Sequence, residues 1–323
     1  MSLIVTFSAV IKERFISTCR KCKRKFKKRR DERKEARECG PSAPPETLPL
    51  KRKRALTLPL PEGTGFVWRS VPPQETNYQL QSLFCSKLLP EIRRQIYQEV
   101  LAPGGRELHL ANADRRLCSM RCTVDTERLP QTPGWRHECW GVPRQDGTYK
   151  SHLHNAPPDE KLLSLLCTCR LIYSEAIDIL YTENTFNVRK SRTIVELPGT
   201  ILPHRFHSIR SLHIDTVFDY PWPQTTLPFP YWPPDVPDTW PMAWKVIAKM
   251  RDLRNLRVSL SQYDIHGSEE DMDDESVLNI LRPLQAVKVP TFVVEFFWPV
   301  RRSQVLRKLG KVSFTMVLNT SRR

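Results

Sequence analysis

Cysteine and histidine residues give two candidate metal sites. Cys19 and Cys22 have C-x-x-C spacing, but no second pair lies near them in the sequence. The other set lies between residues 118 and 154 and comprises Cys118, Cys122, His137, Cys139, His152 and His154. Because a structural zinc ion needs four ligands, and neither set supplies them as short-spaced pairs, we expect no metal and no other cofactor. We interpret the nine cysteines as reduced thiols of an intracellular protein, nuclear or cytoplasmic.

The sequence contains none of the common motifs of catalysis. It has no Gly-rich phosphate loop, no Gly-x-Ser-x-Gly and no His-Glu-x-x-His. Only 11 of its 323 residues are glycine, which disfavours a nucleotide-binding fold. The acidic run at residues 269–275 lacks the glycine and the alternation of a calcium loop, so we interpret it as a turn that caps the next helix. We therefore expect a protein that is not an enzyme.

Basic residues are concentrated near the start of the chain. Residues 12–54 carry 18 Lys or Arg against 6 Asp or Glu, a balance of +12 within a net charge of +16. We expect residues 1–75 to form a basic, mostly disordered arm. Its candidate nuclear-import or polyanion contacts are Lys21, Lys23, Arg24, Lys25, Lys27, Lys28, Arg29, Arg30, Lys51, Arg52, Lys53 and Arg54.

The arm leaves three interpretations open. It serves nuclear import or binds nucleic acid, it is an unspecific solvated segment, or residues 1–30 lie on a membrane surface. The last alternative rests on an apolar helical face followed by Lys and Arg. No run of 18 apolar residues exists, so we expect no transmembrane segment.

A loop rich in proline and tryptophan lies in the last third of the chain. Residues 220–241 hold eight prolines and three tryptophans. The candidate interaction residues of this loop are Trp222, Phe229, Tyr231, Trp232 and Trp240. Packing of these rings against the core is the alternative that we favour.

Residues 88–101 predict an amphipathic helix, with Pro90 in its first turn. Its apolar residues recur at helical spacing, and they are Leu89, Ile92, Ile96, Val100 and Leu101. We expect this row to face the core and Arg93 and Arg94 to face solvent.

Residues 160–181 predict a second helix that is buried on most of its sides. The polar Arg170 and Glu175 of this helix are then explained by an intramolecular salt bridge or a capping contact.

The remaining pattern indicates an α/β (α+β) fold. Predicted strands lie at residues 106–110, 117–124, 184–188, 211–215, 253–260 and 292–297, and predicted helices lie at 242–250 and 275–287. Pro283 should kink or shorten the last helix. The alternation of strand and helix implies parallel pairing through right-handed crossovers, an irregular layer that is distantly leucine-rich-repeat-like. We expect residues 76–323 to form a single domain, with an insertion at about 102–158.

The two helical segments carry a resemblance. Residues 89–96, starting Leu-Pro-Glu-Ile, resemble the opening of an F-box, and residues 165–176 resemble a later F-box helix. In combination, LPEIRRQIYQEVL and LLCTCRLIYSEAIDILYTENTF resemble a family of uncharacterised fungal proteins with an F-box-like domain of unknown function.

The resemblance implies F-box-like helices that dock on the adaptor of a cullin-type ubiquitin ligase. The candidate docking residues are Leu89, Pro90, Glu91, Ile92, Arg93 and Ile96. The expected function is a non-enzymatic protein-interaction module that recognises a client. The oligomeric state stays open.

Overall fold

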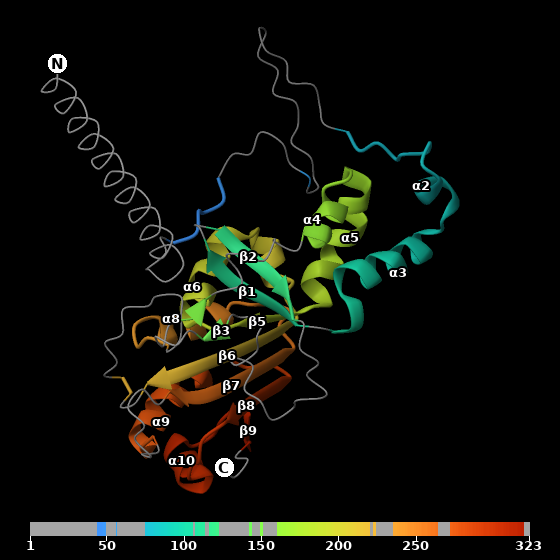
Figure 1. Ribbon diagram of the computed structural model, residues 1–323. Coiled ribbons are helices and arrows are strands. Elements are labelled where there is room, and N and C mark those ends of the chain that lie inside the picture. Colours follow the sequence, from blue (N-terminus) through green and yellow to red (C-terminus); the bar gives the residue numbers. More distant parts are fainter. Residues whose placement is uncertain are drawn as a thin grey trace, which may run out of the picture.

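A mostly parallel β-sheet forms the centre of the chain in the computed structural model (Figure 1). The structure describes residues 44–49, 56, 75–105, 107–113, 116–122, 142–143, 149–150, 160–219, 222–223, 235–263 and 272–319. Within these ranges the sheet has seven strands, ordered β2-β1-β5-β6-β7-β8-β9. They are β1 (Leu108–Ala113), β2 (Arg116–Arg121), β5 (Thr185–Val188), β6 (Ser211–Asp219), β7 (Asn255–Tyr263), β8 (Thr291–Phe296) and β9 (Thr315–Leu318). The prediction of an α/β (α+β) fold is thus confirmed.

From β1 to β9 the strands follow one another in the sheet in the order of the sequence, except that β2 lies on the outer side of β1. β1 pairs with β2 in antiparallel fashion, and every other neighbouring pair of this sheet is parallel. Because such crossovers are right-handed, consecutive connections that all step in one direction place their helices on the same face. The predicted parallel pairing is confirmed. The parallel strands β1 and β5 to β9 all step in one direction, so this part of the described sheet has no point where the strand order reverses, which is where open α/β sheets usually bind small ligands.

The predicted insertion contributes strands to this sheet. Its range includes β1 and β2, as well as the separate pair β3 (Val142–Pro143) and β4 (Tyr149–Lys150). The parallel pairing of β1 with β5 joins residues 108–110 to residues 186–188, which follow the second helical segment. The insertion therefore extends the central layer instead of forming only a separate loop.

Helices connect the strands of the second half of the chain. They are α6 (Ser191–Thr200), α7 (Pro203–His207), α8 (Thr239–Ile247), α9 (Asp274–Leu281), the 3-10 helix η5 (Arg282–Ala286) and α10 (Arg302–Leu309). As predicted, the α-helix that starts at Asp274 is short: it stops before Pro283, which lies in the 3-10 turn. The sequence pattern missed α6, α7, α10 and β9.

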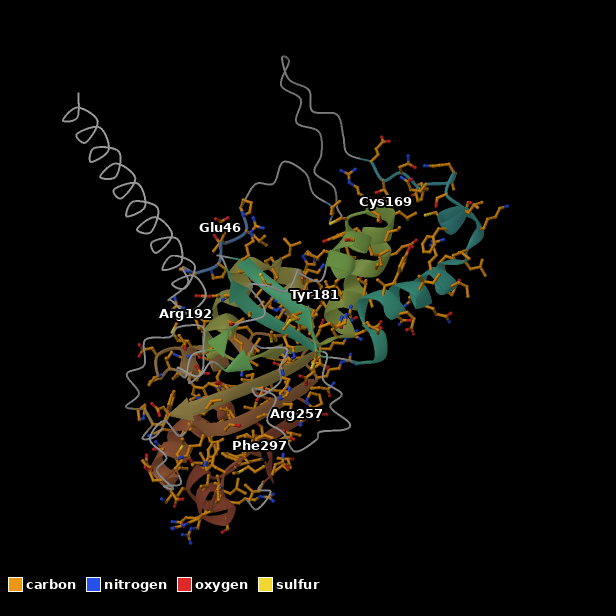
Figure 2. All side chains as sticks on the ribbon, in the orientation of Figure 1. Glu46, Cys169, Tyr181, Arg192, Arg257 and Phe297 are labelled. Carbon is orange, nitrogen blue, oxygen red and sulfur yellow. The ribbon has the colours of Figure 1, made fainter. Side chains whose placement is uncertain are left out.

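A second helical group precedes most of the sheet in the sequence and lies at one end of it (Figure 1). It comprises α2 (Leu83–Lys87), α3 (Pro90–Leu101), the 3-10 turn η1 (Pro103–Gly105), α4 (Glu160–Leu166) and α5 (Arg170–Thr182). The second predicted helix is therefore two helices. Cys169 lies at the break, and its Sγ accepts a hydrogen bond from the Ile172 amide, which caps α5 (Figure 2).

Aromatic rings fill the core beside the sheet. Phe218, Trp240 and Trp244 are at most 1% exposed, and their rings meet edge to face at centroid distances of 4.9 Å and 5.2 Å. The indole Nε1 of Trp240 donates a 2.8 Å hydrogen bond to the Ile280 carbonyl. Trp222 is also buried, with its ring against Phe218. At these two positions the aromatic loop residues pack into the core and offer no exposed interaction face.

The predicted orientation of the first helix is wrong for most of its apolar row, although Leu101 is buried and Arg94 is exposed as predicted. Ile92, Ile96 and Val100 are exposed on α3, whereas Arg93, Tyr97 and Leu101 are buried. These two rows both repeat every fourth residue, so the spacing is the same and only the choice of face differs. The helix is turned so that one row of apolar side chains points away from the core.

Candidate protein-docking surface

The exposed side of α3 carries an apolar row. Leu89 is 66% exposed, Ile92 is 42% exposed, and Ile96 and Val100 are each 37% exposed. Residues three and four positions apart lie on one helical face, so these four side chains form a continuous stripe. We name this stripe the α3 row. Its helix neighbours Glu91, Arg94, Gln95 and Glu99 are also exposed, which gives the apolar stripe a polar border.

Other exposed apolar residues lie close to the α3 row in the sequence or on the neighbouring helix α4. Eleven large hydrophobic residues of the described ranges are exposed, and eight of them belong to residues 78–100 or to α4. Those outside the α3 row are Tyr78, Leu80, Leu83 and Leu163. Single exposed apolar residues are ordinary on protein surfaces, but such a concentration is typical of an interaction site.

A buried polar cluster holds α3 in this orientation. The guanidinium of Arg93 donates from Nε to Glu175 Oε2 at 3.0 Å and from Nη2 to Glu175 Oε1 at 2.5 Å. Tyr97 donates its hydroxyl to Glu175 Oε2 at 2.8 Å. We name these three residues the Arg93 cluster. A bidentate pair of this kind fixes direction as well as distance, so it sets the rotation of α3 against α5.

The Arg93 cluster also orders the segment before α3. Nη1 of Arg93 donates to the carbonyls of Leu88 at 2.8 Å and Cys85 at 3.2 Å, which lie at and just before the end of α2. The predicted intramolecular ion pair of Glu175 is therefore present, with Arg93 as its partner. Arg170 instead donates to the carbonyl of Glu75 at 2.7 Å. Arg93, which we expected to face solvent and contact a partner, acts inside the molecule.

Electrostatics in the Arg93 cluster favour the charged pair. Burial by itself raises the pKa of Glu175, but the hydrogen bonds from Arg93 and Tyr97 lower it below its ordinary value. The hydrogen bond to Glu175 raises the pKa of Arg93. Burial, followed by the nearby carboxylate, raises the pKa of the Tyr97 phenol. The cluster thus stays as a carboxylate, a guanidinium and a neutral phenol at physiological pH.

Side chains from other elements hold the far end of α3. The amide of Asn184 donates to the Leu101 carbonyl at 3.0 Å, and Arg121 of β2 donates to the Val100 carbonyl at 2.9 Å. These contacts satisfy carbonyls that the last turn of a helix leaves free. Held at both ends, α3 presents its apolar row on a fixed support.

A second buried polar cluster crosses the sheet. His213 on β6 contacts Glu107 Oε1 through Nδ1 at 2.6 Å and Ser259 Oγ on β7 through Nε2 at 2.9 Å. Ser259 in turn donates to Glu295 Oε2 on β8 at 2.9 Å. We name this group the His213 cluster. Arg257 completes it with a 2.8 Å hydrogen bond to Glu295.

The His213 cluster has the residue types of a catalytic triad but not its proton arrangement. The burial of His213 lowers its pKa, and the charge of Glu107 outweighs this effect and raises it. The Ser259 hydroxyl donates its proton to Glu295, so it is not arranged to pass that proton to His213. Ser259 is also only 2% exposed. The cluster therefore joins strands and does not activate a nucleophile.

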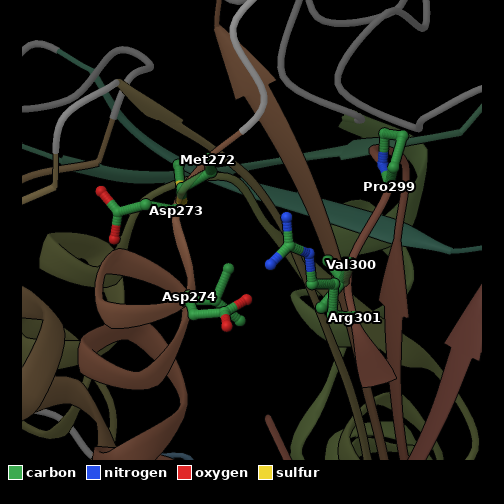
Figure 3. A pocket seen from close by; sticks show the side chains of 7 residues that line it. Met272, Asp273, Asp274, Pro299, Val300 and Arg301 are labelled. Carbon is green, nitrogen blue, oxygen red and sulfur yellow. The ribbon is translucent and has the colours of Figure 1, made fainter. Parts of the chain in front are cut away.

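A cavity of about 480 Å³ lies beside the start of α9. Figure 3 shows Arg301 and Asp274 on opposite sides of it. Met272, Val277 and Val300 add apolar lining. Asp273 also lines it, but its carboxylate accepts hydrogen bonds from the Ser276 amide and hydroxyl and caps α9.

Several predicted site residues cannot be placed. The twelve basic residues of the arm, from Lys21 to Arg30 and Lys51 to Arg54, lie outside the described ranges. Phe229, Tyr231 and Trp232 of the aromatic loop lie outside them too. The nuclear, nucleic-acid and membrane interpretations of the arm stay predictions.

The described ranges contain neither a metal-binding cluster nor a membrane-spanning helix. No group of His, Cys, Asp or Glu residues there could hold a metal ion. Within the same ranges, no helix has the length and apolar character needed to cross a membrane. Cys85, Cys167 and Cys169 are free thiols.

The fold and its exposed row define a class: a singly wound α/β protein with a helical group that presents an apolar surface. The chain belongs to the family described as Domain of unknown function (DUF7730), whose model matches residues 77–317. That range begins just before α2 and ends in β9, so it includes the α3 row and all of the seven-stranded sheet except the last residue of β9. No curated protein and no solved structure matches the chain.

Proposed function

We propose that this chain is a non-enzymatic, intracellular protein-interaction module that docks through the α3 row. The observation that carries the proposal is the exposure of Leu89, Ile92, Ile96 and Val100 on a helix that the Arg93 cluster holds rigid. An unpaired apolar stripe with a polar border is typical of a helix that binds a hydrophobic groove on another protein.

The partner that we propose is the adaptor of a cullin-type ubiquitin ligase. The supporting argument is the resemblance of residues 89–96 and 165–176 to F-box helices and to an F-box-like fungal family. Five of the six candidate docking residues are exposed and accessible to such a partner, namely Leu89, Pro90, Glu91, Ile92 and Ile96. The chain would then act as the client-recognition subunit, with the client bound elsewhere on the α/β domain.

Direct titration of the full chain with a purified adaptor tests the proposal. The double variant Ile92→Glu and Ile96→Glu should bind at least about tenfold more weakly, because the loss of a hot-spot residue near the centre of an interface costs about 2 kcal/mol or more. Exposed positions such as these should change the free energy of unfolding by only about 0.5 kcal/mol each.

The matched control is the double variant Met242→Glu and Leu318→Glu. Both residues are exposed and apolar, 48% and 40%, and they lie on α8 and β9, away from α3. The control should bind like the unchanged chain. A folded chain that does not bind the adaptor would contradict the ubiquitin-ligase assignment. Equal loss in both double variants would contradict the α3 row as the contact surface, and concentration-dependent dimers lost only in the α3 variant would make a second copy its partner.

A further inference from the structure

The turns before four parallel strands carry a concentration of basic side chains. Residues 207–210, 248–254, 286–290 and 310–314 precede β6, β7, β8 and β9. They contain six Lys or Arg and one acidic residue, Asp252. All six are exposed, and they are Arg210, Lys249, Arg251, Arg254, Lys288 and Lys311. We name this set the basic edge.

Backbone hydrogen bonds show that these turns lie next to one another. The amides of Arg254 and Asn255 donate to the Arg210 carbonyl at 2.9 Å and 3.0 Å. The Thr291 amide donates to the Arg254 carbonyl at 2.9 Å, and the Ser313 hydroxyl donates to the Val287 carbonyl at 2.7 Å. The basic edge is therefore one continuous row along the amino ends of β6 to β9, which lie side by side in Figure 1.

The charges of the basic edge are not neutralised within the described part of the chain. None of its six side chains makes an ion pair or a side-chain hydrogen bond there. Arg257, in the strand β7 itself, is by contrast paired with Glu295. The other end of these strands is mixed in charge, with Asp273, Asp274 and Glu275 at the start of α9 and Arg301 and Arg302 after β8. Among the described residues of β6 to β9 and their turns, basic side chains therefore predominate at the basic edge.

We propose that the basic edge binds the phosphate backbone of a nucleic acid, an interaction independent of the α3 row. With strands about 4.8 Å apart, a row across four strands is roughly 14 Å long. Duplex DNA carries one negative charge per about 1.7 Å of its axis, so several phosphates fall within that length. The guanidinium groups of Arg210, Arg251 and Arg254 suit phosphate oxygens because they donate in a fixed fork.

The charge distribution of the whole chain favours a nucleic acid over an acidic protein segment. Residues 12–54 form a second basic region, with 18 Lys or Arg against 6 Asp or Glu. A polymer with a long anionic surface can contact both regions at once, whereas a short acidic segment can satisfy only one. Contacts with phosphates alone carry no sequence information, so the binding should be independent of base sequence.

The test compares two full-length triple variants that lose the same number of charges. The first carries Arg210→Ala, Arg254→Ala and Lys288→Ala. The control carries Lys87→Ala, Arg301→Ala and Arg302→Ala, which are equally exposed but lie outside the basic edge. Affinity for a short duplex DNA and for a single-stranded RNA of equal length is measured against salt concentration.

The basic-edge variant should bind at least about tenfold more weakly. The slope of log affinity against log salt concentration should decrease in magnitude by about 2 to 3, because each of the three lost phosphate contacts contributes about 0.7 to 0.9 to that slope. The control should keep the slope of the unchanged chain. A preference between the two probes would identify the duplex or the single strand as the source of the phosphates. Equal losses in both variants would overturn the proposal, as would basic-edge substitutions that weaken binding of polyglutamate but of neither nucleic acid.

Discussion

Replacement of Glu175 by alanine should lower the free energy of unfolding by about 3 kcal/mol. The change leaves the guanidinium of Arg93, whose side chain is 9% exposed, without its carboxylate partner. It also removes the acceptor of the Tyr97 hydroxyl. Removing one partner of a buried pair costs more than the pair contributes, because the remaining charge is still desolvated. Chemical denaturation of the purified full chain measures the loss.

The control for this prediction is an ion pair whose two members are both exposed. Glu275 pairs with Arg282, and their side chains are 61% and 54% exposed. Glu275→Ala should therefore cost less than about 1 kcal/mol. Adding Arg93→Met to Glu175→Ala should recover part of the loss, since no buried charge is then left alone. Equal costs for Glu175→Ala and Glu275→Ala would show that the Arg93 cluster does not hold α3.

Replacement of Glu107 by glutamine should lower the free energy of unfolding by about 3 kcal/mol near neutral pH. It should also remove the loss of this free energy at acid pH that the wild-type carboxylate causes. Burial would raise the pKa of Glu107, but the positive charge of His213 lowers it from 4.5 to about 2. A lowered carboxyl pKa contributes stability that is present above pH 4.5 and is lost as the pH falls towards about 2. The variant should lack this acid-side loss.

The partner of Glu107 titrates in the opposite sense. Because the pKa of His213 in the folded chain is raised above 6.5, its contribution is present below pH 6.5 and is lost as the pH rises through the folded value. Both contributions are therefore complete only between about pH 4.5 and 6.5. The measurement is the free energy of unfolding across pH. In His213→Asn this free energy should not show the loss above pH 6.5. Glu99→Gln, which changes an exposed carboxylate, should keep both the loss at acid pH and the loss above pH 6.5. Identical profiles for all variants would contradict a charged His213–Glu107 pair.

The sequence pattern correctly predicted most of the elements that form the sheet. Strands with alternating or continuous apolar residues, such as those around Leu212, Leu256 and Phe292, lie where the pattern placed them. Their parallel order follows from the helices between them, and Pro283 ends α9 for the local reason that predicted it. These features depend on neighbours in the sequence, which is why a single sequence reveals them.

The elements that the pattern missed depend on distant residues. Helix α6 contains Pro198 and Gly199, which argue locally against a helix. Its start is held by Asp235, which accepts hydrogen bonds from the amide and hydroxyl of Ser191, 44 positions away in the chain. No local signal in residues 191–200 reveals that contact.

The orientation of α3 could not be predicted for the same reason. Ile92 and Ile96 are more apolar than Arg93 and Tyr97, so hydrophobicity alone places them inside. Glu175, 82 positions further along the chain, reverses that choice by pairing with Arg93. The sequence does contain a second row with helical spacing, formed by Arg93, Tyr97 and Leu101. This row can be buried when a carboxylate accepts hydrogen bonds from Arg93 and Tyr97.

Hydrogen–deuterium exchange of the full chain, alone and with the purified adaptor, reports whether α3 is the docking surface. The bound adaptor should slow exchange in peptides covering Leu89 to Leu101, while peptides of α8 and β9 should exchange as before. Amides at a bound helix open less often, and slower exchange reports this at the level of peptides. Binding that protects other peptides and leaves α3 unchanged would contradict the α3 row as the docking surface.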